Sequence, residues 1–383
     1  MTSIHAVIQR LFTQQKPLPA GTHHYQAPPD AEFPYRLHLR LEADGSGILI
    51  VNAATVLHLN QTAAEFAYHL MKGSTNDEAA HSVSQRYRIS FQNALDDYKD
   101  FNHRINELIN TPDLDPETYL GFERVVPYSQ SLSAPYRLDC ALTYRLAPGS
   151  PADLAPTDRV KRELSTDEWK AILDKAWTAG IPHVVFTGGE PTLRDDLPEL
   201  IAKAEANGQV SGLISDCLRM VDVDYLSTLL QTGLDHLLMM LNPENELAWQ
   251  ALVYLMRADL FVVVHLTLTA ANAPQAGEIL DKLVKMWVKT LSLSAAGPDL
   301  AKDLARTREL ATLRGLTLVW DLPVPYSASH PLALELAGEG EKLPEGAGKA
   351  WLYVEPDGDV LPAQGVTTVL GNLLADEWST IWK

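Results

Sequence analysis

Cysteine is almost missing from this chain, since 383 residues contain only two, Cys140 and Cys217. So few thiols exclude a disulfide-stapled fold, which depends on several pairs within a short secreted chain. Cys140 stands in an apolar run, RLDCALTY, and is most simply a small buried residue. The low count also limits the metal chemistry that the chain can support, because soft metal centres depend on thiolate ligands.

Basic residues are also scarce: 31 Lys and Arg stand against 49 Asp and Glu, a formal net charge of −18. This balance argues against nucleic acid and against an anionic membrane surface as partners, because both favour a basic footprint. No apolar run reaches the roughly 18 residues that would span a bilayer. The start, MTSIHAVIQRLFTQQ, lacks the basic region, long apolar core and cleavage site of a secretory signal. We therefore expect a cytoplasmic protein.

What is present is ordinary for a globular protein, with 46% hydrophobic and 21% charged residues. The length favours one large α/β domain with one or two smaller ones. Residues 1–33 are polar and contain several prolines, which predicts an irregular N-terminal arm. Residues 34–59 alternate apolar and polar side chains around Asp44–Gly47, which predicts a β-hairpin and a further strand. Three helical patterns follow up to residue 110.

The run VLHLNQTAAEFAYHLMKGSTNDEAAHSVSQRY within this region resembles the PqqD-like family. The resemblance implies a winged-helix-like α+β domain over 34–110 that recognises the leader of a ribosomally made, modified peptide. The alternative is a generic winged-helix-like module without a ligand. A polar, proline-bearing linker is expected at 111–134.

Strand-like and helical patterns alternate from residue 135 to about 325. Because the strands are nearly continuous apolar runs, we expect a parallel sheet covered by helices, as in a partial or complete (β/α) barrel. Active sites of such barrels lie at the C-terminal ends of the strands. The expected strands are 136–144, 183–187, 210–215, 236–242, 260–268, 290–296 and 316–322. The remainder, 326–383, is expected to hold a hairpin around Pro356–Gly358 and a short terminal helix.

The most informative motif is FTGGEPTLR, which follows the second strand of the expected barrel. Glycines at a strand end allow close backbone approach, and a strand-end carboxylate accepts hydrogen bonds from an amine. The motif resembles the Gly-Gly-Glu-Pro signature of radical S-adenosylmethionine (SAM) enzymes, and so implies a TIM-like barrel of that type. The resemblance implies that Gly188, Gly189 and Glu190 hold the amino group of the methionine part of SAM.

The same resemblance places three cluster-binding cysteines after the first strand, where this sequence has Leu146, Ser150 and Asp153. The C-terminal segment resembles a SPASM or twitch extension, in which a cysteine is expected at Ala363. Since a [4Fe–4S] cluster needs three or four thiolates, we expect no cluster, at most weak SAM binding and no other cofactor. The sequence thus predicts a non-catalytic homologue, a pseudoenzyme, that binds a precursor peptide or an active radical SAM maturase paralogue.

Other readings stay open. The chain could be a cluster-free enzyme or sensor that still binds SAM or another small molecule at the barrel mouth. Asp153, Asp216 and Glu190 could meet there around a hard cation. His183 and His265 stand alone in apolar strands, which is typical of satisfied core histidines.

Overall fold

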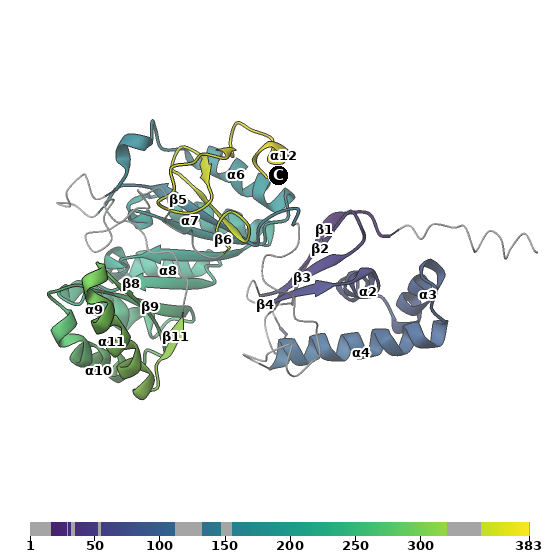
Figure 1. Ribbon diagram of the computed structural model, residues 1–383, viewed down its shortest axis with the longest axis horizontal. Coiled ribbons are helices and arrows are strands. Elements are labelled where there is room, and N and C mark those ends of the chain that lie inside the picture. Colours follow the sequence, from purple (N-terminus) through teal and green to yellow (C-terminus); the bar gives the residue numbers. More distant parts are fainter. Residues whose placement is uncertain are drawn as a thin grey trace, which may run out of the picture. The chain divides into compact units, whose positions relative to one another are not determined.

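The chain divides into two compact units, Met1–Ser129 and Gln130–Lys383. A computed structural model describes residues 17–28, 30–31, 35–52, 55–111, 132–146, 155–319 and 346–382 (Figure 1). Each unit is treated by itself below. Within the described residues no helix has the length and apolar character needed to cross a bilayer.

The N-terminal unit is an antiparallel sheet followed by three helices. The sheet order is β1-β2-β3-β4, so β1 and β4 form its two edges. The expected hairpin and third strand are confirmed. The strands are β1 (Gly21–Gln26), β2 (Arg36–Leu41), β3 (Gly47–Val51) and β4 (Thr55–Leu59), and the helices are α2 (Gln61–Met71), α3 (Asn76–Arg86) and α4 (Phe91–Asn110).

Each of these helices begins at a residue that caps its free N–H groups. The side chains of Asn60, Thr75 and Ser90 accept hydrogen bonds from the backbone of the first turn of α2, α3 and α4. At α3 the cap is reciprocal, because Glu78 also accepts from the backbone of Thr75 at 2.8 Å. The local sequence therefore determines where these helices start.

The expectation of an irregular arm over 1–33 is corrected by strand β1. Its residues, GTHHYQ, pair with β2 from Gly21 opposite Leu41 to Gln26 opposite Arg36. The sequence pattern did not predict this strand because it lies at an edge, where most of its side chains remain at least partly exposed and polar.

The C-terminal unit has a ten-stranded sheet in the order β11-β10-β9-β8-β7-β6-β5-β12-β13-β14. Neighbours from β5 to β11 pair in parallel, as in a partial barrel. The parallel strands are β5 (Arg137–Thr143), β6 (His183–Gly188), β7 (Val210–Ser215), β8 (His236–Met240), β9 (Phe261–Leu268), β10 (Thr290–Ala295) and β11 (Thr317–Val319). The expected strand at 316–322 is thus described only to residue 319.

Helices connect these strands and pack on the sheet (Figure 1). The longer ones are α6 (Thr166–Thr178), α7 (Leu197–Asn207), α8 (Val223–Gln231), α9 (Glu246–Leu255), α10 (Ala276–Lys285) and α11 (Ala301–Leu313). Alternate strand residues such as Leu138, Cys140 and Phe186 belong to one large buried cluster with apolar residues of these helices. The other face of the strands carries a small apolar cluster with Val185 and Ile214, and, nearer the strand ends, polar side chains.

The C-terminal segment extends the same sheet. The expected hairpin is confirmed as β12 (Trp351–Val354) and β13 (Asp359–Leu361), followed by β14 (Gly371–Asn372) and α12 (Trp378–Ile381). Strand β12 pairs in parallel with β5, with Trp351 opposite Arg137. That pairing joins segments more than 200 residues apart and was not predicted from the sequence.

Candidate functional site

The Gly-Gly-Glu-Pro motif lies at the carboxyl end of β6, where the chain passes the end of β5. Gly189 N–H donates to Thr143 O at 2.7 Å, and Glu190 N–H donates to Arg145 O at 2.8 Å. A Cβ on Gly188 would lie 2.2 Å from Thr143 O, and one on Gly189 would lie 2.2 Å from Arg145 O. Both glycines are therefore required by the close approach of the chain that leaves β5.

Glu190 joins the end of β6 to the end of β7. One carboxylate oxygen, Oε1, accepts from Thr192 N–H at 2.9 Å and from Ser215 Oγ at 2.8 Å. The other, Oε2, accepts from Asp216 N–H at 2.7 Å. The side chain is only 5% exposed. The motif's acid is thus held by its own chain in one fixed position.

Asp216 places a second carboxyl group beside Glu190. Burial, and then the charge of Asp216, raise the pKa of Glu190 to about 8. Burial also raises the pKa of Asp216. Two neighbouring buried carboxyl groups do not both ionise readily, because each charge disfavours the other.

Arg194 anchors the motif to β5 and to the segment before α6. Its guanidinium is 7% exposed and donates to Leu142 O at 3.2 Å and to Leu164 O at 2.9 Å. It also forms a two-pronged ion pair with Asp196, with distances of 2.9 and 2.6 Å. The last residue of the FTGGEPTLR string therefore has a positioning role that the sequence analysis did not assign.

Thr187, just before the two glycines, has a buried hydroxyl group. Its Oγ1 has no hydrogen-bond partner among the described residues, and the residue is 0% exposed. A buried hydroxyl without a partner is unfavourable. An unsatisfied donor beside the motif fits a site that takes a polar ligand.

The structure describes two of the remaining positions expected from the resemblance, Leu146 and Ala363. Leu146 packs with a small cluster that includes Tyr144 and Tyr353. Ser150 and Asp153 lie outside the described residues, so the possible cation site that includes Asp153 is untested. Ala363 is 3% exposed and follows β13.

The two histidines singled out from the sequence have polar partners. His265 is 1% exposed, and its ring nitrogens contact Ser292 Oγ and Ser294 Oγ, both at 2.9 Å. His183 Nε2 lies 3.3 Å from His236 Nε2. Burial lowers the pKa of His236 to about 4, so this ring is neutral at physiological pH.

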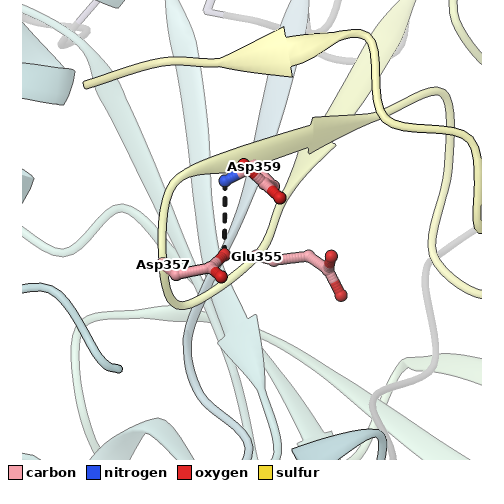
Figure 2. Close-up of side chains that lie close together, drawn as sticks. All are labelled: Glu355, Asp357 and Asp359. Atoms are coloured by element: carbon pink, nitrogen blue, oxygen red, sulfur yellow. Dashed lines mark hydrogen bonds between the residues drawn. The ribbon is translucent and has the colours of Figure 1, made fainter. Parts of the chain in front are cut away.

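A group of three acids lies on the turn between β12 and β13, where Figure 2 shows Glu355, Asp357 and Asp359. Their oxygens come within 4.8 Å of one another. Glu355 is already engaged, because it accepts from Tyr144 at 2.9 Å and pairs with Arg159 at 3.1 Å. The group therefore ties the hairpin to the rest of its unit.

The N-terminal unit contains a cavity that the sequence did not predict. Its volume is about 310 Å³, and it lies between the end of β4, the start of α2 and one face of α4. The lining residues are His58, Leu59, Asn60, Thr62, Ala63, Phe66, Asp97, Asp100, Phe101 and Arg104. Only the spacing of apolar residues on α4 hinted at a shared face with α2.

Comparisons with known proteins agree with this description. Residues 140–267 match the family model of the Radical SAM superfamily. The chain is 26% identical to a PqqA peptide cyclase of Streptomyces rochei, over 66% of this chain and 76% of the relative. It is 28% identical to a PqqA peptide cyclase of Methylobacterium sp. (strain 4-46), over 63% of this chain and 70% of the relative.

Solved structures show the same fold. Streptococcus suis SuiB bound to S-adenosylmethionine is 15% identical, with a TM-score of 0.58 over 94% of this chain and 88% of that one. SuiB bound to precursor peptide SuiA is also 15% identical, with a TM-score of 0.58 over 90% of this chain and 87% of that one.

These findings correct two expectations. The prediction of a non-enzyme is wrong, because the curated relatives are named as cyclases and the matched superfamily points to an enzyme. The prediction of no cofactor beyond weakly bound SAM is also wrong, because the superfamily that the chain matches is one whose members bind SAM. The error in both came from treating the thiol count as sufficient to decide activity.

The thiols of this chain still do not match a three-cysteine cluster site. Cys140 and Cys217 are the two cysteines of the sequence, and both are buried. Burial raises the pKa of both thiols, so neither is a thiolate at neutral pH. These two thiols do not form the ligand set of such a cluster, whereas the hydroxyl of Thr187, which has no partner among the described residues, fits a polar ligand. Residues 140–267 thus match the Radical SAM superfamily model, and the chain is similar to proteins named PqqA peptide cyclase.

Proposed function

We propose that this protein takes part in the modification of a ribosomally made precursor peptide, which its N-terminal unit binds as an added strand along β4. The observation that carries the proposal is an edge strand beside a preformed cavity. Strand β4 pairs with β3, and no other described strand covers its far side. An edge strand offers N–H and C=O groups to an extended peptide.

The cavity supplies what an edge alone lacks. Backbone hydrogen bonds give affinity to an added strand, whereas pockets for its side chains give specificity. Leu59 and His58 of β4 line the cavity together with Phe66 of α2 and Phe101 of α4. A peptide that pairs with β4 would therefore place side chains directly over it. This role is assigned to the PqqD-like domain expected over 34–110.

The comparisons support a peptide as substrate. The curated relatives are named PqqA peptide cyclase, and SuiB was solved with its precursor peptide SuiA. We assign the amino-acid part of SAM to the end of β6, at Gly188, Gly189 and Glu190. The degenerate SPASM or twitch-like extension over 326–383 and a maturase partner remain part of the proposal.

A calorimetric titration tests the SAM assignment. Because the motif would hold the amino-acid part, SAM should bind at least 10-fold more tightly than 5′-methylthioadenosine, which lacks that part. SAM bound at this motif would supply the cofactor chemistry. The titration measures only whether SAM binds. Equal affinity for the two compounds, or no heat with either, would remove the assignment.

Filling the cavity should weaken peptide binding. Ala63 is half-buried on the first turn of α2 and lines the cavity. In Ala63→Trp the indole would occupy space needed by the peptide, so we expect affinity to fall about 10-fold. The probes are fluorescein-labelled synthetic peptides encoded by short reading frames beside the gene, followed by fluorescence anisotropy.

Lys99→Trp is the matched control, since Lys99 is exposed on α4 and does not line the cavity. It should bind the same peptide as tightly as the unchanged protein. Circular dichroism of both variants checks that the unit is folded. Peptide binding that is equally strong in Ala63→Trp would contradict the proposed site, and failure of every peptide to bind would remove the proposed function.

A further inference from the structure

We propose that the β4–α4 cavity selects peptides that carry a basic side chain two positions from an apolar one, and that Asp97 makes this selection. The proposal rests on the proposed function, because it names the class of peptide that this same site accepts. It follows from the charges on one face of α4, from the apolar floor beneath them and from the distance between the two.

One face of α4 carries the charges. Asp100 and Phe101 lie three and four residues after Asp97, Arg104 lies four and three residues after them, and all four line the cavity. Asp100 and Arg104 neutralise each other through an ion pair of 2.6 Å. Asp97 is exposed and forms no ion pair with any Lys, Arg or His that the structure describes. The cavity therefore keeps one uncompensated carboxylate at its wall.

Apolar side chains form the floor. Leu59 and Phe66 are each 4% exposed and Phe101 is 6% exposed, although all three line the cavity. They are well packed from behind, since the rings of Phe66 and Phe101 lie 6.1 Å apart. Such a surface gains most from an aliphatic or aromatic side chain of a ligand, which would remove more apolar area from water.

The spacing of Asp97 and Phe101 along α4 is close to the repeat of side chains on one face of an extended peptide. Asp97 and Phe101 are four residues apart on α4, which corresponds to about 6 Å along the helix axis. Alternate side chains on one face of a β-strand are about 6.6 Å apart. A peptide strand that runs alongside α4 would thus present a Lys or Arg to Asp97 and an apolar side chain to the floor in the same pose.

The charge of the whole chain favours the same ligand. With a net charge of −18, the protein attracts basic peptides at long range and repels acidic ones. The carboxylate of Asp97 in the cavity wall would direct that attraction to one position of the bound peptide.

Selection of random 12-residue peptides displayed on phage tests the proposal with the full chain as bait. We expect enrichment of sequences with Lys or Arg two positions from Leu, Ile, Val or an aromatic residue. Asp97→Lys should remove that basic preference and weaken a synthetic enriched peptide about 5- to 10-fold in low salt, because an attraction becomes a repulsion. Raising the ionic strength should weaken the same peptide's binding to the unchanged protein.

Asp96→Lys is the matched control. Asp96 is exposed on the same turn of α4, accepts a hydrogen bond from Gln92 Nε2 at 3.0 Å and does not line the cavity. It makes the same change in net charge and should leave the preference unchanged. Enriched peptides that bind at the cavity without a basic residue, or equal effects of the two substitutions, would overturn the role of Asp97 and leave the proposed function intact. If no peptide is enriched, both fail together.

Discussion

Replacing Gly188 by alanine should lower the free energy of unfolding of the C-terminal unit by about 4 kcal/mol. Gly188 has φ +127°, a conformation that costs a residue with a side chain on the order of 1–3 kcal/mol. The new Cβ would also lie 2.2 Å from Thr143 O, a backbone atom that cannot turn away. Displacing it costs a further 1–3 kcal/mol or so. Unfolding in urea, followed by circular dichroism, measures the change.

Two other glycines separate these causes. Gly315 has φ +77° with nothing within 4 Å of an added Cβ, so Gly315→Ala should cost about 1 kcal/mol through conformation alone. Gly277 lies in α10, where an added Cβ would lie 3.8 Å from Arg314 Nη2, and Gly277→Ala should stabilise the unit by about 0.5 kcal/mol. A loss below 1 kcal/mol for Gly188→Ala would show that the ends of β5 and β6 are not in contact as described.

Replacing Asp216 by asparagine should stabilise the protein at pH 8.5 by about 1–2 kcal/mol and change it little at pH 5. In the folded chain the pKa of Glu190 is raised to about 8, from 4.5. Between these values the native state binds a proton that the unfolded state has released, so stability falls as the pH rises through this window. Removing the Asp216 charge lowers the pKa of Glu190 and reduces the loss.

Burial is the larger cause of the raised pKa of Glu190, so the substitution recovers only part of the effect. The measurement is the free energy of unfolding at pH 5, 7 and 8.5. Asp195→Asn is the control, because Asp195 is 91% exposed and pairs with Arg219 on the surface. Its pH profile should match that of the unchanged protein. Parallel profiles for Asp216→Asn and the unchanged protein would show that the two carboxyl groups do not interact.

The errors of the sequence analysis have identifiable causes. Strand β1 was missed because an exposed edge strand needs no apolar alternation. Activity and cofactor binding were denied on the number and positions of the cysteines. The cysteine count concerns the ligands of one cluster only. The similarity to a protein named as a cyclase extends over 66% of the chain.

What the sequence determined by itself is local. Alternating and helical periodicity located most strands and helices. The Gly-Gly-Glu-Pro run also identified the end of β6 as the place to look, because glycine freedom and a strand-end acid are properties of adjacent residues.

Only the tertiary structure decided which distant groups meet. It placed Thr143 O against Gly188, Asp216 beside Glu190, and β12 beside β5. It also formed a cavity between the residues of β4 and those of α4. Such contacts depend on how layers pack and on strand order, and a linear pattern of polar and apolar residues carries neither.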